Sequence, residues 1–144
     1  ASRQKQRIWL ILAFAILTYF ASDYSPQKVT SVPVAQSTLE QAIQQQRSDV
    51  QLEVSGTVYK LLADDLEGSR HQKFLIRTAD GHSLLIVHNI DLAPRLNSLQ
   101  NGDLLSVFGE YEWNDKGGLI HWTHHDPAGQ HIAGWIKHQG QTYQ

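Results

Sequence analysis

Apolar and polar residues follow two different patterns along the chain. An almost unbroken apolar run lies near the N-terminus, and short alternating stretches begin near residue 50. Alternating stretches of this kind, bounded by Gly, Asp and Asn, are typical of β-strands joined by turns. The stretches that we expect to be strands are residues 50–62, 70–78, 83–90, 104–113, 119–125 and 131–138. The pattern therefore predicts a mostly β domain.

Two stretches indicate short helices. Residues 37–40 read Ser-Thr-Leu-Glu, a capping box, and the apolar residues after them keep helical spacing, so we expect a helix that ends near Arg47. Residues 91–99 predict a second short helix, between the third and fourth strands. The N-terminal apolar run predicts a hydrophobic helix ahead of the domain.

Turn residues indicate how the strands connect. Asp80-Gly81 is the strongest hairpin signal in the sequence, and it predicts a two-residue turn. Residues 114–118 predict a second hairpin with a five-residue loop. Gly56 lies inside the first expected strand, where it indicates a bulge or a sharp bend.

The order of the expected elements is that of the OB-fold, a small five-stranded Greek-key barrel. We therefore expect an OB-like antiparallel barrel of five or six strands with a short helix, over residues 37–144. A different small β-barrel or an antiparallel α+β sheet would give a similar string of elements. OB-barrels bind oligonucleotides or oligosaccharides, but a fold by itself does not assign a function.

The N-terminus has the order of an export signal. Arg3, Lys5 and Arg7 directly precede the apolar run. The run is short for a membrane span, which favours a signal peptide, whereas the lack of a good small-residue cleavage site favours an uncleaved anchor. The expected division of the chain is a signal anchor or signal peptide at residues 1–22, a linker at 23–36 and the barrel domain at 37–144.

The same charges predict where the domain resides. The positive-inside rule places it outside the cytoplasm, on the periplasmic side, either anchored in the inner membrane or secreted after cleavage. The alternative is a buried N-terminal helix in a cytosolic protein.

Composition narrows the available chemistry. The chain has 144 residues, enough for one small domain, and no cysteine, which excludes disulfides, thiolate zinc sites and cysteine nucleophiles. All eight histidines lie between His71 and His138. The formal net charge is −2, with +3 in residues 1–36 and therefore −5 in the remainder. An acidic domain argues against a broad basic face for nucleic acid.

Three blocks of the sequence resemble a known family. They are Arg-His-Gln-Lys-Phe at 70–74, His-Asn-Ile-Asp-Leu-Ala-Pro-Arg at 88–95 and Gly-Gly-Leu-Ile-His-Trp-Thr-His-His-Asp-Pro at 117–127. The blocks resemble those of a family of small exported bacterial proteins catalogued only as a domain of unknown function. The resemblance covers roughly residues 54–144 and implies export and an OB-like fold. It transfers no catalytic residue, because we know of no established activity for that family.

The first hairpin is expected to sort its polar residues onto one face. With a two-residue turn, Lys73 lies opposite His88, and His71 lies diagonally beside them. The outward residues are then His71, Lys73, Arg77 and His88, and the inward ones are Phe74, Ile76, Leu85 and Val87. An ordinary solvated polar face is the alternative interpretation.

The second hairpin is expected to place polar residues inside the barrel. With a five-residue loop the opposed pairs are Tyr111 and His121, Gly109 and Thr123, and Val107 and His125. The other face then holds Glu110, Glu112, Trp122 and His124. Buried polar groups must be hydrogen-bonded, so the inner face is either a ligand site or a closed His-Thr-Tyr network.

Histidine pairs suit general acid–base chemistry because imidazole titrates near neutral pH. A nearby Arg or Lys would supply a cation for charge that develops on a phosphoryl group. The candidate catalytic residues are His121, His125, His88, Arg70, His71 and Lys73. This set predicts a hydrolase of a phosphodiester or similar anionic substrate.

A simple His-rich metal site fails on distance. His121 and His125 are four strand steps apart, about 13 Å, so they cannot ligate one ion from a straight strand. A zinc-like divalent ion, the one cofactor that we consider, would need ligands from several segments. The candidate ligands are His88, Asp91, His124 and Asp126.

Two other functional hypotheses stay open. One is a non-catalytic module of the cell envelope that binds an oligosaccharide or nucleic acid by stacking. Its candidate binding residues are Tyr111, Trp113, Trp122, Thr123 and Asn89, with Trp135 as a further ring. The other is a structural accessory of an envelope complex, held to the membrane by the N-terminal segment, whose protein partner the sequence does not identify.

Overall fold

The computed structural model describes residues 38–144, so the expected N-terminal helix and all of the expected linker lie outside the described residues. The elements are α2 (Thr38–Gln44), β1 (Val50–Leu61), β2 (His71–Arg77), β3 (Ser83–Asn89), β4 (Leu104–Glu112), β5 (Leu119–His121), β6 (Trp135–His138) and β7 (Gln141–Tyr143). Across residues 38–144, no helix is both long enough and apolar enough to span a bilayer.

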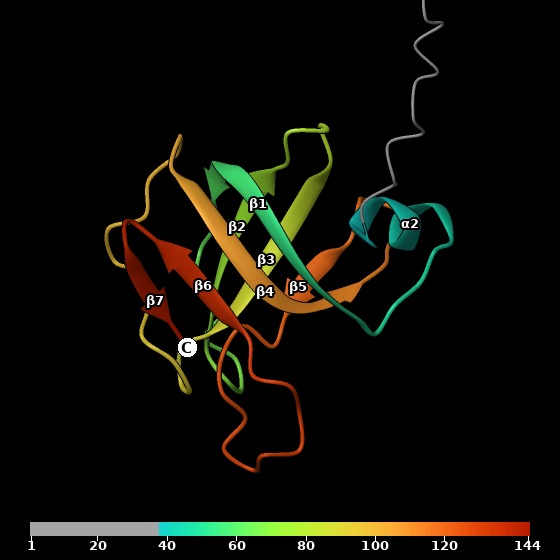
Figure 1. Ribbon diagram of the computed structural model, residues 1–144. Coiled ribbons are helices and arrows are strands. Elements are labelled where there is room, and N and C mark those ends of the chain that lie inside the picture. The colour runs from blue at the N-terminus through green and yellow to red at the C-terminus, as the bar shows by residue number, and fades with distance from the viewer. Residues whose placement is uncertain (1–37) are drawn as a thin grey trace, which may run out of the picture. The chain divides into compact units, whose positions relative to one another are not determined.

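The first five strands form a closed barrel (Figure 1). Their order is β1-β2-β3-β5-β4, and β4 returns to pair with β1, which closes the ring. Among the paired strands of residues 38–144, only β3 and β5 run parallel. This confirms the predicted OB-like barrel. The strands β6 and β7 extend the sheet beyond β4, and the chain between β5 and β6 leaves the barrel as a long loop.

Alternation along the strands determines which side chains fill the barrel. In β2, β3 and β4 every second residue is buried, as expected from the period of two. The largest of the fully buried apolar side chains are Tyr111, Phe74, Ile76, Leu84, Ile86, Leu96, Ile120 and Ile136. The short helix α2 adds Leu39 and Ala42 to this core, which confirms the helix predicted from the capping box.

The long strand β1 serves two neighbours. It pairs with β4 as far as Thr57 and with β2 from Thr57 onward. The change of partner follows Gly56, where a Cβ atom would lie 3.0 Å from the carbonyl oxygen of Arg77. The irregularity predicted at Gly56 is therefore a change of partner, and the register shift itself falls between Val58 and Lys60.

The first hairpin has a different register from the predicted one. Its loop has three residues, with Thr78 N–H donating to the carbonyl of His82 at 2.9 Å, and Gly81 in the left-handed conformation at φ 87°. Gln72, not Lys73, therefore lies opposite His88. A one-residue slip reverses the faces of a strand. His88, Leu84 and Ile86 consequently point into the barrel, whereas His71, Lys73 and Arg77 point outward as expected.

The second hairpin is also shifted by one residue. Glu112 lies opposite Leu119 and Glu110 opposite His121, so the connecting loop has six residues. Tyr111 points inward as expected, but its partner is Ile120. His121 therefore lies on the outer face, beside the two carboxylates from which the prediction had separated it.

Three predicted elements differ in extent or type. Residues 91–99 form turns and not a helix, because the side chain of Gln72 takes both backbone groups of Leu96, at 2.9 and 3.0 Å. The strand β5 ends at His121, since the backbone of Trp122 is left-handed. The last predicted strand starts at Trp135 and is followed by β7, which the pattern did not reveal.

Candidate functional site

A pocket on the outer face of the barrel brings three histidines together. Its volume is about 200 Å³, and its lining residues are His71, Val87, Asn89, Leu92, His121, Trp122 and His124. They come from β2, β3, β5 and the segments that follow β3 and β5. OB-barrels use the face over their second and third strands to bind ligands. The pocket is thus the candidate site by both position and chemistry.

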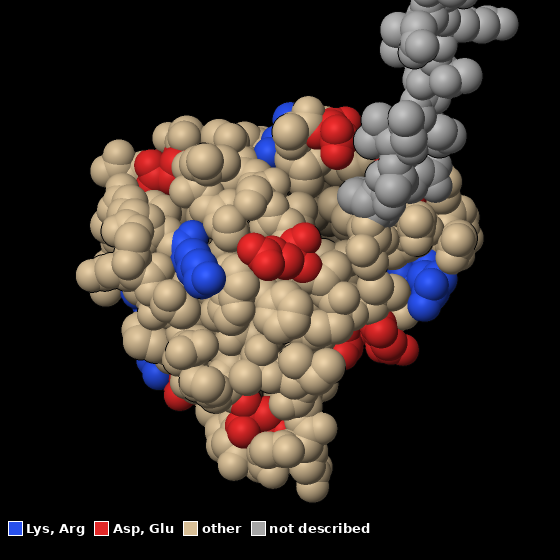
Figure 2. Space-filling view, in the orientation of Figure 1, with Lys and Arg blue, Asp and Glu red and all other residues tan. Residues whose placement is uncertain are grey.

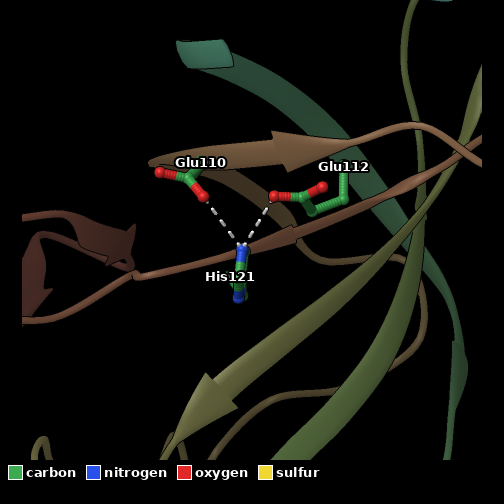
Figure 3. Close-up of side chains that lie close together, drawn as sticks. All are labelled: Glu110, Glu112 and His121. Atoms are coloured by element: carbon green, nitrogen blue, oxygen red, sulfur yellow. Dashed lines mark ion pairs between the residues drawn. The ribbon is translucent and has the colours of Figure 1, made fainter. Parts of the chain in front are cut away.

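One of these histidines lies between the pocket and a pair of carboxylates (Figure 3). The Nε2 atom of His121 is 3.4 Å from Glu110 Oε1 and 3.5 Å from Glu112 Oε1. These distances allow charge attraction, but Nε2 is buried and has no hydrogen-bond partner. Figure 3 shows the other ring nitrogen, Nδ1, pointing away from the carboxylates. In the sheet, β5 lies between two strands: β4, which carries the two carboxylates, is on one side, and β3 is on the other.

The carboxylate cluster has a second, fully bonded imidazole. His131 donates from Nδ1 to the carbonyl of Ile132 at 2.8 Å and from Nε2 to Glu110 Oε2 at 2.6 Å, so both nitrogens carry protons. Burial lowers the pKa of His131, but the hydrogen bonds and negative charges of its neighbours outweigh burial and raise the pKa overall. Glu110 therefore has one oxygen engaged by His131 and the other facing His121.

A third carboxyl group, that of Asp49, lies next to Glu112. The hydrogen bond to Glu112, followed by the repulsion between the two carboxyl groups, raises the pKa of Asp49. Asp49 is also left-handed, at φ 57°. Three carboxyl groups, those of Asp49, Glu110 and Glu112, therefore lie on this side of His121.

Trp122, which lines the pocket, has a strained backbone conformation. Its φ of 54° is rare for a bulky residue, and such strain persists only where surrounding contacts hold it. The indole stacks on His131 with 4.0 Å between ring centroids and packs against His124 at 5.3 Å. A Cβ atom on Gly134 would collide with the carbonyl oxygen of Trp122, so β6 enters directly against this residue.

The hydrogen bond that His124 makes shows which of its two ring nitrogens carries the proton. Its Nδ1 lies 2.6 Å from the carbonyl oxygen of His125, which only accepts, so Nδ1 carries the proton. In the neutral ring Nε2 is then a lone-pair acceptor. His71, on β2, makes no side-chain hydrogen bond within residues 38–144. The pocket therefore contains imidazole nitrogens that are available to a ligand.

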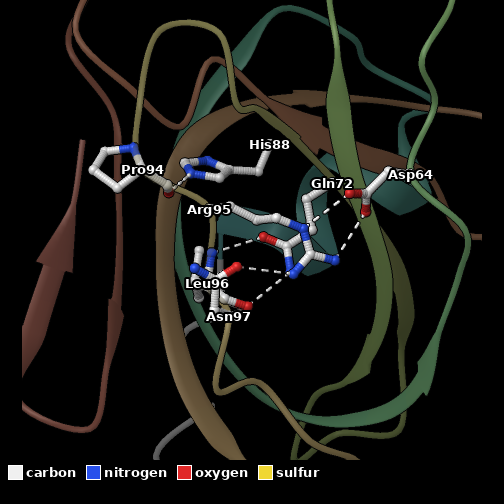
Figure 4. A network of polar contacts seen from close by, with 7 residues as sticks. All are labelled: Asp64, Gln72, His88, Pro94, Arg95, Leu96 and Asn97. Carbon is white, nitrogen blue, oxygen red and sulfur yellow. Dashed lines mark hydrogen bonds and ion pairs between the residues drawn. The ribbon is translucent and has the colours of Figure 1, made fainter.

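His88 does not belong to this pocket. It is fully buried, with Nε2 donating to the carbonyl of Pro94 at 3.1 Å (Figure 4) and Nδ1 accepting from the hydroxyl of Thr123 at 2.7 Å. Burial, opposed by the Pro94 hydrogen bond, lowers the pKa of His88 from 6.5 to about 4. Of the predicted catalytic histidines, His121 lines the pocket, whereas His88 is enclosed in the barrel and His125 is exposed outside the pocket.

The predicted cations are also elsewhere. Arg70 is paired with Asp91, with 2.6 Å between Nε and Oδ1. Lys73 lines a separate hollow beside Arg95 and Leu96. Within residues 38–144, no Lys or Arg lines the histidine pocket, so positive charge from these residues would have to come from imidazolium.

The predicted binding residues separate into two groups. Trp122 and Asn89 line the pocket. Tyr111 is a core residue whose hydroxyl donates to the carbonyl of Gly117 at 3.1 Å, and burial raises its pKa. Thr123 is buried against His88, and Trp113 packs against the core. These three hold the barrel together and do not line the site.

The predicted metal ligands do not form a group within residues 38–144. Two of them are already engaged: Asp126 accepts from three backbone N–H groups, and Asp91 accepts from the backbone and side chain of Arg70. Backbone hydrogen bonds are the largest cause that lowers the pKa of each of these carboxyls. The group of potential ligands that does come together is Glu110, Glu112 and His121.

Sequence reasoning missed Glu110, Glu112 and His131 as site residues. The sequence did indicate that Glu110 and Glu112 lie on the same face, because residues i and i+2 on a strand share a face. Their contact with His121 depended on the hairpin register. His131 carried no signal, since a long loop brings it back to Glu110.

Surface charge agrees with the acidic composition. Figure 2 shows Lys, Arg, Asp and Glu scattered over the visible face, without a continuous basic patch. A face that grips nucleic acid through many phosphates needs such a patch. On the face in view, no such surface is present.

The fold and the pocket define a class of protein: an OB-like barrel with a histidine-lined hollow on its outer face. The chain belongs to a family described as "Protein of unknown function (DUF3465)", which matches residues 8–144. No curated protein matches the sequence.

Proposed function

We propose that this protein is a hydrolase whose acid–base groups are the imidazoles of the histidine pocket. The observation that carries the proposal is the position of His121 between two carboxylates on β4 and the pocket over β3. A carboxylate beside one imidazole nitrogen stabilises the ring when the other nitrogen accepts a proton. Glu110 and Glu112 thus suit His121 to act as a general base from Nδ1.

A second imidazole completes the proposed reaction. His121 takes a proton from a water molecule, the water oxygen attacks the substrate, and the bond to the leaving group breaks as that group receives a proton from His71 or His124. The proton gained by His121 then returns to solvent or to the second imidazole. Each group ends in its starting state, so the cycle needs no additional reactant.

The substrate class that we propose is a phosphodiester or a similar anion. The pocket, at about 200 Å³, suits one small group and not a long polymer. Because no Lys or Arg of the described residues lines the pocket, we propose that protonated imidazole meets the negative charge of the substrate. The pH dependence of turnover should therefore follow histidine.

Export and membrane attachment remain part of the proposal. They are supported by Arg3, Lys5 and Arg7 ahead of the apolar run at residues 8–21. We propose that the barrel faces the periplasm and that the N-terminal segment is its membrane partner.

One observation favours a second candidate, a non-catalytic module that binds a sugar or nucleic acid. The pocket lies on the face that OB-barrels use for ligands. Stacking is less favoured, because Trp122 is stacked on His131 and Trp135 on Phe108 at 5.8 Å. The module would then bind through imidazole and amide hydrogen bonds.

The test is turnover of a panel of phosphodiesters, including an activated aryl diester, RNA and single-stranded DNA. His121→Ala should lower turnover by about 100-fold or more, since a general base contributes at least that much. The matched control is His125→Ala, which removes an exposed imidazole outside the pocket and should keep full turnover. Equal losses in both variants, or no turnover of any substrate by the unmodified chain, would contradict the proposal. Binding without turnover would favour the second candidate.

A further inference from the structure

The Nε2 atom of His121 is a polar atom that the fold buries without satisfying it. It has no hydrogen-bond partner, although it lies between two carboxylate oxygens (Figure 3). Buried polar atoms are nearly always bonded, so an orphaned nitrogen facing two anionic oxygens calls for an explanation. The proposed hydrolysis uses the charge of the two carboxylates beside this nitrogen, but it gives the nitrogen no hydrogen-bond partner.

We propose that Glu110, Glu112 and His121 bind one divalent transition-metal ion of the zinc type. Two ligands that are about 2.0–2.1 Å from zinc at a tetrahedral angle are about 3.4 Å apart. The two nitrogen–oxygen distances, 3.4 and 3.5 Å, match this spacing. All three donor atoms lie within 4.8 Å of one another, so a small rotation of the partly exposed Glu112 completes the geometry.

The backbone preorganises these ligands. Glu110 and Glu112 are two residues apart on β4 and share a face, and His121 lies directly opposite Glu110 on β5. A site built on paired strands is held more accurately than one built on loops. The ligands are therefore in place before an ion arrives.

An outer hydrogen bond orients one of the ligands. His131 donates to Oε2 of Glu110 and leaves Oε1 facing His121, and Trp122 stacks on the His131 ring. Supporting contacts of this kind commonly hold metal ligands in orientation. Glu110 thus has one oxygen committed to the protein and one presented toward the proposed ion.

The donor set selects the class of metal. Imidazole suits zinc and its neighbours in the transition series, whereas calcium and magnesium prefer oxygen alone. Three protein ligands also leave a fourth position for water, as in catalytic zinc sites. The inference does not depend on the proposed hydrolysis, because binding of zinc can be measured without any substrate.

Isothermal titration of the chelator-treated full chain with zinc chloride, near neutral pH, tests the site. We expect one zinc ion per chain with a Kd of about 10 μM or tighter. His121→Ala and Glu112→Gln should each weaken binding at least about 10-fold. Magnesium chloride, titrated in the same way, should give no binding.

The matched control is His125→Ala, which removes an exposed imidazole and should leave zinc affinity unchanged. Because Glu112→Gln keeps the size of the side chain and one acceptor oxygen, it separates loss of a ligand from loss of the fold. Thermal unfolding of each variant measures the fold directly. Zinc affinity that survives His121→Ala, or an unmodified chain that binds no zinc at about 100 μM, would overturn the inference. Neither result bears on turnover by the metal-free chain.

Discussion

Two histidines on adjacent, paired strands have opposite surroundings. His88 on β3 points into the barrel, is fully buried and has both ring nitrogens bonded within the chain. His121 on β5 points outward, keeps about a third of its side chain exposed and has an unbonded Nε2. The same residue type is bonded at both ring nitrogens in one position and keeps an unbonded ring nitrogen in the other.

The difference shows that hydrogen-bond saturation, not residue type, separates the two roles. The nitrogens of His88 already have a hydroxyl and a carbonyl as partners, so a ligand would have to displace them. His121 lies beside the carboxylates of Glu110 and Glu112 without a hydrogen bond to either, and it lines the pocket. Its groups are therefore available to a proton, an ion or a substrate.

The largest expected effect is on stability. His88→Ala should lower the free energy of unfolding by about 3–5 kcal/mol, because it leaves a cavity and strands the partner groups of Thr123 and Pro94. His121→Ala should lower it by less than about 1 kcal/mol, since the side chain is partly exposed and its contacts are long. Urea unfolding measures both values. Equal losses would remove the distinction between the two histidines.

The next effect is a dependence of stability on pH. Because the pKa of His88 is lowered from 6.5 to about 4 in the fold, the unfolded chain binds more protons between these values. The stabilising contribution is therefore complete above pH 6.5 and is lost as the pH falls to about 4, by up to about 3 kcal/mol. His71 and His124 lie close enough for their charge to contribute to the shift.

A neutral substitute isolates this titration. His88→Gln keeps one donor and one acceptor but has no proton to gain, so the unfolding free energy should vary less between pH 6.5 and 4 than in the unmodified chain. His131 opposes the trend, since its raised pKa gives a contribution that is lost as the pH rises. An unchanged slope in the glutamine variant would show that other groups cause the pH dependence.

The smallest effect is expected at the neighbouring surface pair. Arg95 follows Pro94 in the same loop, and its Nε atom is 2.9 Å from Asp64 Oδ2 (Figure 4). The Arg95 hydrogen bond is the main cause that lowers the pKa of Asp64. Because the arginine is 40% exposed, Arg95→Ala should lower the unfolding free energy by less than about 1 kcal/mol. A loss as large as that of His88→Ala would mean that the outer contact, not the buried imidazole, holds the loop.

The fold was largely predictable from the chain, and the two hairpin registers were not. Strand positions followed from alternation and turn residues, as in β2 and β3. Each register depended on whether a loop held one residue more or less, which the turn residues Asp80-Gly81 left undetermined. The predicted registers were each wrong by one residue. They therefore placed His88 outside the barrel and His121 inside it, the reverse of the observed positions.

The candidate site was predictable only in composition. A cluster of histidines without cysteine indicated imidazole chemistry, and His71, His121, Trp122 and Asn89 do line the pocket. The pairing of His121 with Glu110 and Glu112 needed the β4–β5 register. The contact of His131 with Glu110 needed the path of the loop after β5, which has no period from which to infer it.

The amino-acid sequence alone determined the barrel, its helix and its acidic, histidine-rich character, because those follow from local periodicity and composition. Only the tertiary structure decided which histidine is enclosed and which lines the pocket. That choice depends on register and on contacts between residues far apart in the chain, where a shift of about 3.3 Å along a strand exchanges the inside of a barrel for the outside.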